Sequence, residues 1–410
     1  MKFLTDDISI TFRKTLILLL LFTSTFLSFY LYHTFLLIDI LQNYYSSYEQ
    51  VFFGRAIFYI FLTIFQVIGS IISDKISRKK LLLCWVSSGT VIISLMIVFQ
   101  SINNILFFCA LLGASYGLGI PSCFAYLAES TIIEERGRVS GVVQVSIFLF
   151  LLLVLKLNDV YFLNTYESQI LSLVLRIITF IPLALDSFPK EAGKPIQIHT
   201  ILSSRVFLIF LIPWVMFNVS NGVLIFIENQ LALDEAFKIV IEIGPSYQYL
   251  GTFIFGFIAA VLADRYGRKQ PLILGFIVLG IAYALVGIAN SPQNWYMMNV
   301  LSGVGWGCIM VSYQWVILGD IAPTGSREKY YALGLIVPTL SEMTFSFLES
   351  AIDVNIGASA IASALSILLL LSVFPLLIAP ETLPENKIRS RRLRDYIKKV
   401  GEILSEKGDI

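Results

Sequence analysis

The sequence predicts an all-α membrane protein in which twelve spanning helices form two bundles of six. Three observations predict this class. The chain is 57% hydrophobic and only 14% charged, whereas soluble domains carry about 25% charged residues. Apolar segments long enough to cross a bilayer as helices recur along all 410 residues. Charged motifs that follow these segments repeat at an interval of about 190 residues.

Each predicted span is an apolar segment that ends near a charged or polar turn. The twelve segments are residues 15–40, 51–73, 81–100, 105–127, 139–157, 168–186, 205–228, 246–263, 271–290, 295–319, 331–351 and 356–379. Residues 229–245 have two interpretations, an external helix or an extension of the eighth span. The first segment is too long for the hydrophobic region of a signal peptide, and further spans follow it.

Lysine and arginine lie almost entirely on one side of the predicted membrane. The loops on the side of the N-terminus hold all but four of the 29 basic residues, and the four are Arg55, Lys156, Arg176 and Lys238. Cytoplasmic loops carry the excess of basic residues in such proteins. We therefore expect a multi-pass protein of the cell membrane with both termini in the cytoplasm.

The basic tail has apolar residues at helical spacing. It is interpreted either as a helix that lies on anionic membrane lipids or as a solvated helix that only sets topology.

Composition disfavours several other classes of protein. The formal net charge of +1 gives no reason to expect nucleic acid as a partner. The four cysteines lie inside apolar runs, without metal-ligand or disulfide spacing. With only His33 and His199, no catalytic or metal cluster assembles, and no phosphate-binding Gly-x(4)-Gly-Lys-Ser/Thr loop is present. We therefore expect no enzyme activity, no metal, no cofactor and no ATP-driven pump.

Two pairs of loops carry the repeat. The motif "SIISDKISRK" follows the second span and "AVLADRYGRK" follows the eighth, which places Asp74 and Asp264 190 residues apart. The motif "AESTIIEERG" follows the fourth span and "GDIAPTGSRE" follows the tenth, which places Glu129 and Asp320 191 residues apart. Two halves with the same orientation predict a transporter plan of two bundles around a site near the bilayer midplane.

The repeat also divides the chain. We expect an N-terminal bundle over 1–186, a cytoplasmic linker over 187–204, a C-terminal bundle over 205–380 and a basic tail over 381–410.

These motifs resemble those of the major facilitator superfamily. "ADRYGRK" (263–269) matches the loop signature of that family, and "SDKISRK" (73–79) is a weaker copy with Ser77 where glycine is usual. The most similar subgroup is that of the sugar porters and related solute–proton symporters. Three stretches resemble its motifs: "YLAESTIIEERG", "WVILGDIAPTGSR", with Asp320 where glutamate is usual, and "PETLPE". The resemblance covers the whole chain and implies transport by alternating access.

The resemblance implies a cytoplasmic gate. Asp74 and Asp264 should each face the start of a span in the other half, the eleventh and the fifth respectively. Glu129 with Arg136, and Asp320 with Arg327, are each seven residues apart in their loops. These pairs should then form ion clusters with Arg78, Arg265 and Arg268 that latch the halves together. The candidate gate residues are Asp74, Arg78, Glu129, Arg136, Asp264, Arg265, Arg268, Asp320 and Arg327. The alternative, loop charge that only sets topology, explains the arginines but not the acids at matched spacing.

Glu134 and Glu135 have no counterpart in the second half. The sequence therefore assigns them no role beyond solvation.

Five residues are candidates for binding solute: Gln144, Asn218, Asn221, Trp315 and Glu342. Sugar porters carry a substrate-binding glutamine at the position of Gln144, although an amide there could also bond a neighbouring helix. Asn221 resembles a pocket asparagine of the family and shares a helical face with Asn218 and Glu228. Trp315 matches a pocket tryptophan, with core packing as its alternative. The glutamine expected before Asn221 is replaced, which argues against a hexose.

Proton coupling has three candidates, Glu342, His33 and Asp39. Glu342 lies eleven residues into its span, or about 17 Å along the helix and near mid-bilayer, where a carboxyl could take up a proton or simply bond a neighbouring helix. Proton-coupled relatives usually carry an aspartate in span one and an arginine in span four. Cys109 stands at the arginine position here, and no acid occupies the middle of span one. Asp39 is expected to pair with Arg55, and Arg176 is expected to be structural.

The sequence therefore predicts a secondary transporter for a small polar organic solute, a sugar or a small organic acid or other metabolite. It would work as a symporter or a uniporter. Its expected partners are the solute, protons if transport is coupled, and membrane lipids around a monomer. The alternative is a sensor with a transporter fold that binds solute and signals through its tail.

Overall fold

The computed structural model describes residues 9–161, 164–231, 234–351, 357–390, 393 and 396–397. In the first half the helices are α2 (Phe12–Tyr30), η1 (Leu31–Leu36), α3 (Leu37–Gln42), α4 (Tyr48–Ile72), α5 (Arg78–Phe99), α6 (Ile105–Ser130), α7 (Arg136–Tyr161), α8 (Thr165–Ile178) and α9 (Phe180–Leu185). The short helix α10 (Ile198–Leu202) lies in the predicted linker. In the second half the helices are α11 (Arg205–Leu231), α12 (Glu235–Tyr266), α13 (Lys269–Ile288), α14 (Pro292–Ile309), η2 (Met310–Ile317), α15 (Leu318–Ile321), α16 (Arg327–Ala351), α17 (Ala358–Leu371) and α18 (Val373–Ile378).

The predicted fold class is confirmed. Within the described residues, eleven helical segments are long and apolar enough to cross a membrane. The eleventh span, predicted at 331–351, lies in α16, a 25-residue helix that carries Glu342, and the side chains of 345–350 lie outside the described residues. In the stretch 229–245, residues 229–231 belong to α11 and 232–233 lie outside the described residues. The remainder extends the eighth span, because α12 is continuous from Glu235 to Tyr266.

Short polar signals determine where several apolar runs become helical. The Ser47 hydroxyl accepts a hydrogen bond from the backbone N–H of Gln50 at the start of α4. Asn164 and Glu167 form a reciprocal capping box at the start of α8. Such caps satisfy backbone donors that the first helical turn leaves unpaired.

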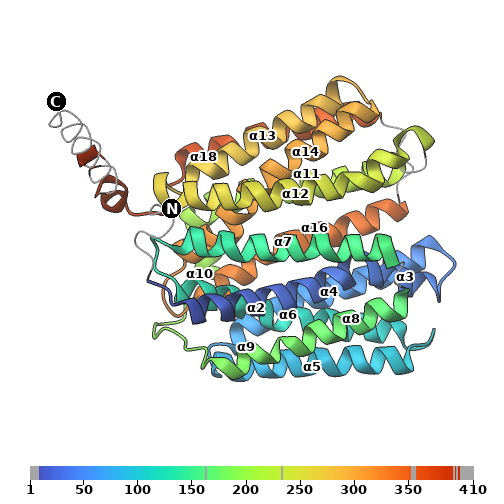
Figure 1. Cartoon of the computed structure of the whole chain (residues 1–410), viewed down its shortest axis with the longest axis horizontal. Helices are drawn as coiled ribbons and strands as arrows, with labels where there is room; N and C mark the ends of the chain where they lie inside the picture. The colour runs from blue at the N-terminus through green and yellow to red at the C-terminus, as the bar shows by residue number, and fades with distance from the viewer. Residues whose placement is uncertain are drawn as a thin grey trace, which may run out of the picture.

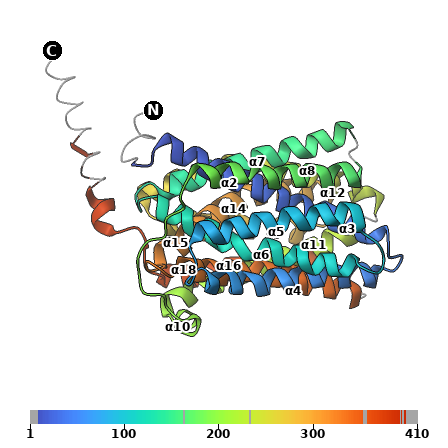
Figure 2. The same ribbon diagram turned by 90° about the horizontal axis from the view of Figure 1, so that it is seen from below.

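The long helices run roughly parallel, and the two halves lie side by side (Figure 1). Within each half, the second and fourth spans pack together, α4 on α6 and α12 on α14. Between the halves, α7 packs along α12 and α16 packs along α4. The start of α2, the end of α18 and the short helix α10 lie at the same end of the molecule (Figures 1 and 2), which we call the charged end.

Small residues bring equivalent helices together in both halves. A Cβ added to Gly117 of α6 would collide with the backbone carbonyl of Leu62 in α4. A Cβ added to Gly307 of α14 would lie 2.6 Å from the backbone nitrogen of Gly256 in α12. Gly117 and Gly307 are 190 residues apart. The repeat therefore extends from the loops into the packing of the spans, where small residues allow close helix contact.

Candidate functional site

Two arginines at the charged end each pair with an acid of the opposite half. Arg136, at the start of α7, forms an ion pair with Asp320. Arg327, at the start of α16, lies 3.9 Å from the carboxylate of Glu129 and 2.6 Å from that of Glu191 in the linker. The seven-residue spacing in the sequence suggested a pairing within each loop. The structure instead exchanges the partners, so each arginine joins the two halves.

A second pair of arginines, Arg78 and Arg268, is more deeply buried than the first. The guanidinium of Arg78 lies 2.9 Å from the carboxylate of Glu129, and that of Arg268 lies 3.1 Å from Asp320. These contacts are equivalent in the repeat. Arg78 also reaches across to Glu328 at 2.6 Å, whereas Arg268 contacts Asp264 of its own half at 2.5 Å.

The acids at the ends of spans two and eight face the starts of helices in the other half. Asp264 accepts hydrogen bonds from the backbone N–H groups of Gly137 and Arg138, each at 2.8 Å, and its carboxylate lies 3.1 Å from the Arg138 side chain. Asp74 lies 2.6 Å from the ammonium of Lys329, in the first turn of α16. Both acids therefore lie where the positive end of a helix dipole stabilises a carboxylate.

Sequence reasoning missed Arg138, Lys329 and Glu328. The first two carried a usable signal, because Arg138 and Lys329 are 191 residues apart and each follows its loop arginine by two positions. Glu328 takes the place of Gly137 in the repeat, so alignment of the halves gave no reason to expect an acid there. Arg265, a predicted gate residue, lies with its guanidinium 5.4 Å from the ring centroid of Tyr266.

The prediction that Glu134 and Glu135 are merely solvated is wrong. Glu135 is completely buried. Its carboxylate accepts hydrogen bonds from the backbone N–H and the hydroxyl of Ser9 and from the backbone N–H of Ile10. Glu134 lies 2.5 Å from the ammonium of Lys387, which follows the last span. Both acids therefore hold terminal segments of the chain against this loop.

The motif after the last span also contacts a gate loop. Glu381 of "PETLPE" accepts hydrogen bonds from the backbone N–H groups of Arg268 at 2.7 Å and Lys269 at 3.2 Å, at the start of α13. The preceding residue, Gly267, has φ 111°, which favours glycine. Its counterpart Ser77 has φ −64°. Serine therefore replaces the usual glycine without backbone strain.

Burial determines how strong this network is. The side chains of Arg268 and Asp320 are 0% exposed, and that of Arg78 is also 0% exposed. Burial lowers the pKa of Arg268, but Asp320 and then Asp264 outweigh it, so the pKa is raised and the charge is retained. Removal of one partner from a buried pair destabilises by about 3–5 kcal/mol, against about 0–1 kcal/mol for an exposed pair.

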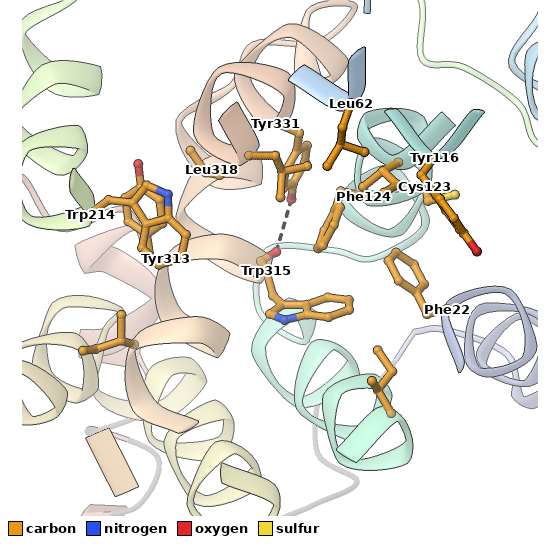
Figure 3. Close-up of a cluster of buried hydrophobic side chains, with 14 of the residues drawn as sticks. Phe22, Leu62, Tyr116, Cys123, Phe124, Trp214, Tyr313, Trp315, Leu318 and Tyr331 are labelled. Atoms are coloured by element: carbon orange, nitrogen blue, oxygen red, sulfur yellow. Dashed lines mark hydrogen bonds between the residues drawn. The ribbon is translucent and has the colours of Figure 1, made fainter. Parts of the chain in front are cut away.

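Aromatic rings from both halves pack together in the interior (Figure 3). The ring centroids of Phe124 and Trp315 are 4.7 Å apart, and those of Phe22 and Trp315 are 4.9 Å apart. Phe124 and Trp315 occupy equivalent positions, each five residues before the acid of its loop. The hydroxyl of Tyr331 donates to the backbone carbonyl of Trp315. Trp315, which is 3% exposed, therefore packs against rings of the opposite half.

Gln144 lies at the contact between α7 and α12. It is 1% exposed, and neither its amide nitrogen nor its amide oxygen has a hydrogen-bond partner among the residues that the structure describes. A Cβ at Gly256 of α12 would lie 2.6 Å from the amide nitrogen. The side chain therefore reaches the other half with its full hydrogen-bonding capacity unused.

The asparagines of α11 differ in how they are used. The side-chain amide nitrogen of Asn218 donates to the backbone carbonyl of Trp214 at 2.7 Å, and the backbone carbonyl of Asn218 accepts from the Ser341 hydroxyl of α16 at 2.8 Å. Asn221, one turn further along, is half-buried. The side-chain amide of Asn218 thus donates a hydrogen bond within its own helix.

The polar residues of the membrane interior lie between the halves, away from the charged end. Glu342 of α16 pairs with Arg55 of α4 at 3.9 Å. His33 lies close enough to both to interact electrostatically and is packed against the rings of Phe29 and Tyr59. The expected pair of Arg55 with Asp39 is wrong. Arg55 turns toward α16 because the interior carboxylate is there, and Asp39 is exposed.

Direct hydrogen bonds join the halves in the same region. The Tyr30 and Tyr249 hydroxyls bond each other, and the Thr63 and Thr339 hydroxyls are 2.9 Å apart. Gln144 and Glu342 thus lie on helices that meet across the interface between the halves, and His33 of η1 lies near the pair of Glu342 with Arg55.

The fold and these contacts define a class: a polytopic helical membrane protein whose two repeated halves meet through charge networks. The sequence model described as Major Facilitator Superfamily matches residues 18–155 and 201–407. The chain belongs to this family.

Solved structures of the family share the fold at low sequence identity. The chain is similar to a structure of the proton:xylose symporter XylE bound to 6-bromo-6-deoxy-D-glucose, with a TM-score of 0.70, 15% identity, and coverage of 90% of this chain and 96% of that one. It is also similar to the human organic anion transporter MFSD10 (TETRAN), with a TM-score of 0.69, 16% identity, and coverage of 89% and 99%.

Two curated relatives match over short segments. The multidrug transporter protein MdtP of Bacillus subtilis (strain 168) is 34% identical over 73 residues, which is 18% of this chain and 13% of the relative. The MFS-type transporter gkaD of Penicillium citrinum is 33% identical over 89 residues, which is 22% of this chain and 15% of the relative. The match thus spans only a small part of either relative.

Proposed function

We propose that the protein is a secondary transporter that moves a small polar organic solute across the cell membrane by alternating access. The two bundles, 1–186 and 205–380, are the moving bodies, joined by the linker 187–204. The observation that carries this proposal is the exchange of partners at the charged end, where Arg136 pairs with Asp320 and Arg327 approaches Glu129. Such pairs hold only while the halves are closed at that end.

The closed end is the cytoplasmic end if the basic loops obey the positive-inside rule. The nine predicted gate residues, together with Arg138, Glu328 and Lys329, then form the latch of the outward-directed state. A network of buried pairs can set the populations of two states, because a shift from 1:99 to 99:1 needs only about 5.5 kcal/mol.

Solute binding is assigned to the five predicted residues between the halves. Gln144 is the strongest candidate, because both polar atoms of its buried amide lack a hydrogen-bond partner among the described residues and could bond a solute. Asn221 and Glu342 supply further polar groups, whereas Asn218 and Trp315 act by shaping the path. The similar proteins include a xylose symporter, an organic anion transporter and a multidrug transporter. We therefore propose a sugar, a small organic acid or another small metabolite as the solute, and the sugar porters as the subgroup.

Proton coupling is assigned to Glu342, with Arg55 and His33 as its neighbours. The pair of Glu342 with Arg55 joins α16 to α4, so protonation of the carboxyl would weaken a contact between the halves. Fifteen residues separate Glu342 from Arg327, or about 22 Å of helix, so this contact is remote from the latch. Asp39 is the weakest coupling candidate because it is exposed.

Uptake into proteoliposomes tests both parts of the proposal. The full chain is supplied with a panel of sugars, organic acids and other polar metabolites, with and without an inward proton gradient. We expect one class to accumulate, and Glu342→Gln to abolish the response to the gradient while counterflow continues. A gradient response unchanged in Glu342→Gln would refute the coupling assignment. Absence of any uptake, with solute binding retained, would favour the sensor.

The sensor alternative rests on the contact of Lys387 with Glu134, which links the start of the tail to a gate loop.

A further inference from the structure

Arg176 places a positive charge in the interior of the N-terminal half. It lies on α8 and is completely buried. Its Nη2 donates to the backbone carbonyl of Trp85 at 3.0 Å and to the hydroxyl of Ser115 at 3.4 Å. The guanidinium stacks at 4.3 Å from the ring centroid of Trp85 and 5.0 Å from that of Tyr116. All of these partners are neutral.

The charge has no counterion among the described residues. The gate arginines Arg78, Arg136 and Arg268 each lie against a carboxylate, whereas no acid pairs with Arg176 in the described part of the chain. In addition, Nε and Nη1 are buried without a hydrogen-bond partner. An unpaired charge in a membrane interior is strongly unfavourable. Aromatic faces offset part of this penalty but accept no in-plane N–H hydrogen bond.

Further unused polar atoms lie on the helices around Arg176. The indole nitrogen of Trp85 and the hydroxyl of Ser122 are buried without a hydrogen-bond partner in the part of the chain that the structure describes. The Trp85 ring covers Gly119 of α6, so a Cβ there would collide with it. Ser115, Gly119 and Ser122 are spaced four and three residues apart and therefore share one face of α6. The unused donors thus belong to helix faces that surround a single guanidinium.

The lack of a side chain at Gly89 leaves room for the guanidinium of Arg176. A Cβ on Gly89 of α5 would lie 2.5 Å from Nε of Arg176 and 2.7 Å from the Ser115 hydroxyl. A larger residue there would exclude the arginine. The site is enclosed within one half, between α5, α6 and α8, rather than in the path between the halves. Its occupant is therefore not the transported solute.

We propose that Arg176 is the centre of a binding site for a small monovalent anion of halide size, with chloride as the natural occupant. An anion supplies the missing charge and accepts from donors that the protein leaves unused. A water molecule could accept those hydrogen bonds but would leave the charge uncompensated.

Thermal unfolding of the purified full chain tests the site. Chloride is titrated against gluconate at constant ionic strength, and acetate is titrated in parallel. We expect chloride to raise the Tm saturably by about 2–4 °C, because an anion bound only to the folded state stabilises it by mass action. Tryptophan fluorescence should change over the same concentrations, because Trp85 contacts the guanidinium. Trp85→Phe should remove that change.

Variants separate this site from general salt effects. Arg176→Gln should lose the chloride-dependent rise, and Arg176→Lys should keep it at a higher half-saturating concentration. Arg55→Gln, which removes an interior arginine that has a carboxylate partner, should keep the rise. If Arg176→Gln does not fold, the chloride titrations of the wild-type protein and of Arg176→Lys still test the proposal. Equal Tm in chloride and gluconate, a rise with acetate alone, or a rise that persists in Arg176→Gln would overturn the proposal.

Discussion

At the scale of single residues, the gate depends on how closely a carboxylate approaches a helix start. Asp264 shows this, since it accepts from two successive backbone N–H groups of α7 and also contacts Arg138 and Arg268. A Cβ at Gly137 would collide with the Asp264 carboxylate. The glycine of the Arg-Gly pair is therefore required by the approach of the acid, and not by its own backbone angles.

Gly137→Ala should separate Asp264 from α7. We expect a loss of about 1–3 kcal/mol, typical of an overpacked contact, and a smaller population closed at the charged end. Thermal unfolding and spin-label distances across that end measure the two effects. Gly357→Ala is the matched control, because a Cβ there meets nothing within 4 Å. An equal effect of both substitutions would contradict this account of Gly137.

At the scale of elements, one loop holds three segments that are distant in the sequence. The turn between α6 and α7 places Arg136 against Asp320, Glu135 against the residues before α2, and Glu134 against Lys387. Successive side chains of a turn point in different directions, which allows neighbouring residues to reach separate partners. The turn therefore links the N-terminus, the opposite half and the start of the tail.

Glu135→Gln should release the segment before α2. The amide keeps one acceptor oxygen but loses the charge that strengthens three hydrogen bonds, each worth about 1.5–3 kcal/mol when charged. We expect faster hydrogen exchange in the peptide that contains Ser9 and Ile10. Glu134→Gln is the neighbouring control and should instead loosen the segment at Lys387. Unchanged exchange in Glu135→Gln would show that the segment is held by packing alone.

At the scale of the whole molecule, the two halves form a closed pseudo-twofold arrangement. Equivalent pairs recur on both sides: Arg136 with Asp320 and Arg327 with Glu129, and Asp264 with Arg138 and Asp74 with Lys329. The symmetry is incomplete, since Arg78 reaches Glu328 of the other half but Arg268 reaches Asp264 of its own. Arg78 therefore adds an ion pair between the halves that Arg268 does not.

Arg327→Ala should shift the protein toward the state that is open at the charged end, and Arg136→Ala should shift it further. Arg136 is more buried, and its removal leaves Asp320 with one fewer cation in a fully buried site, at a cost of about 3–5 kcal/mol. Spin-label distances between the α4–α5 and α12–α13 loops report the populations. Lys238→Ala, an exposed change near the start of α12, should leave them unchanged. If neither arginine variant altered the distances, the ion pairs would not form a latch.

Much of the fold was predictable because membrane insertion is governed by local sequence. Apolar length determines which segments span, and the loop arginines and lysines predict their orientation. The 190-residue repeat predicted two matched halves and placed Asp74, Glu129, Asp264 and Asp320 near the loops. The eleventh span was likewise predicted from its apolar length and lies within α16, although it carries Glu342.

The sequence by itself therefore determined the spans, the repeat and the charged loops, since each depends on residue type and spacing along the chain. Only the tertiary structure decided which charges pair. In the structure, Arg136 pairs with an acid of the opposite half and Arg55 pairs with Glu342 rather than with Asp39. Glu135 is buried, and Arg176 lies among neutral groups. The physical reason is that the strength and the partner of a charge depend on burial and on helices brought together from distant parts of the chain.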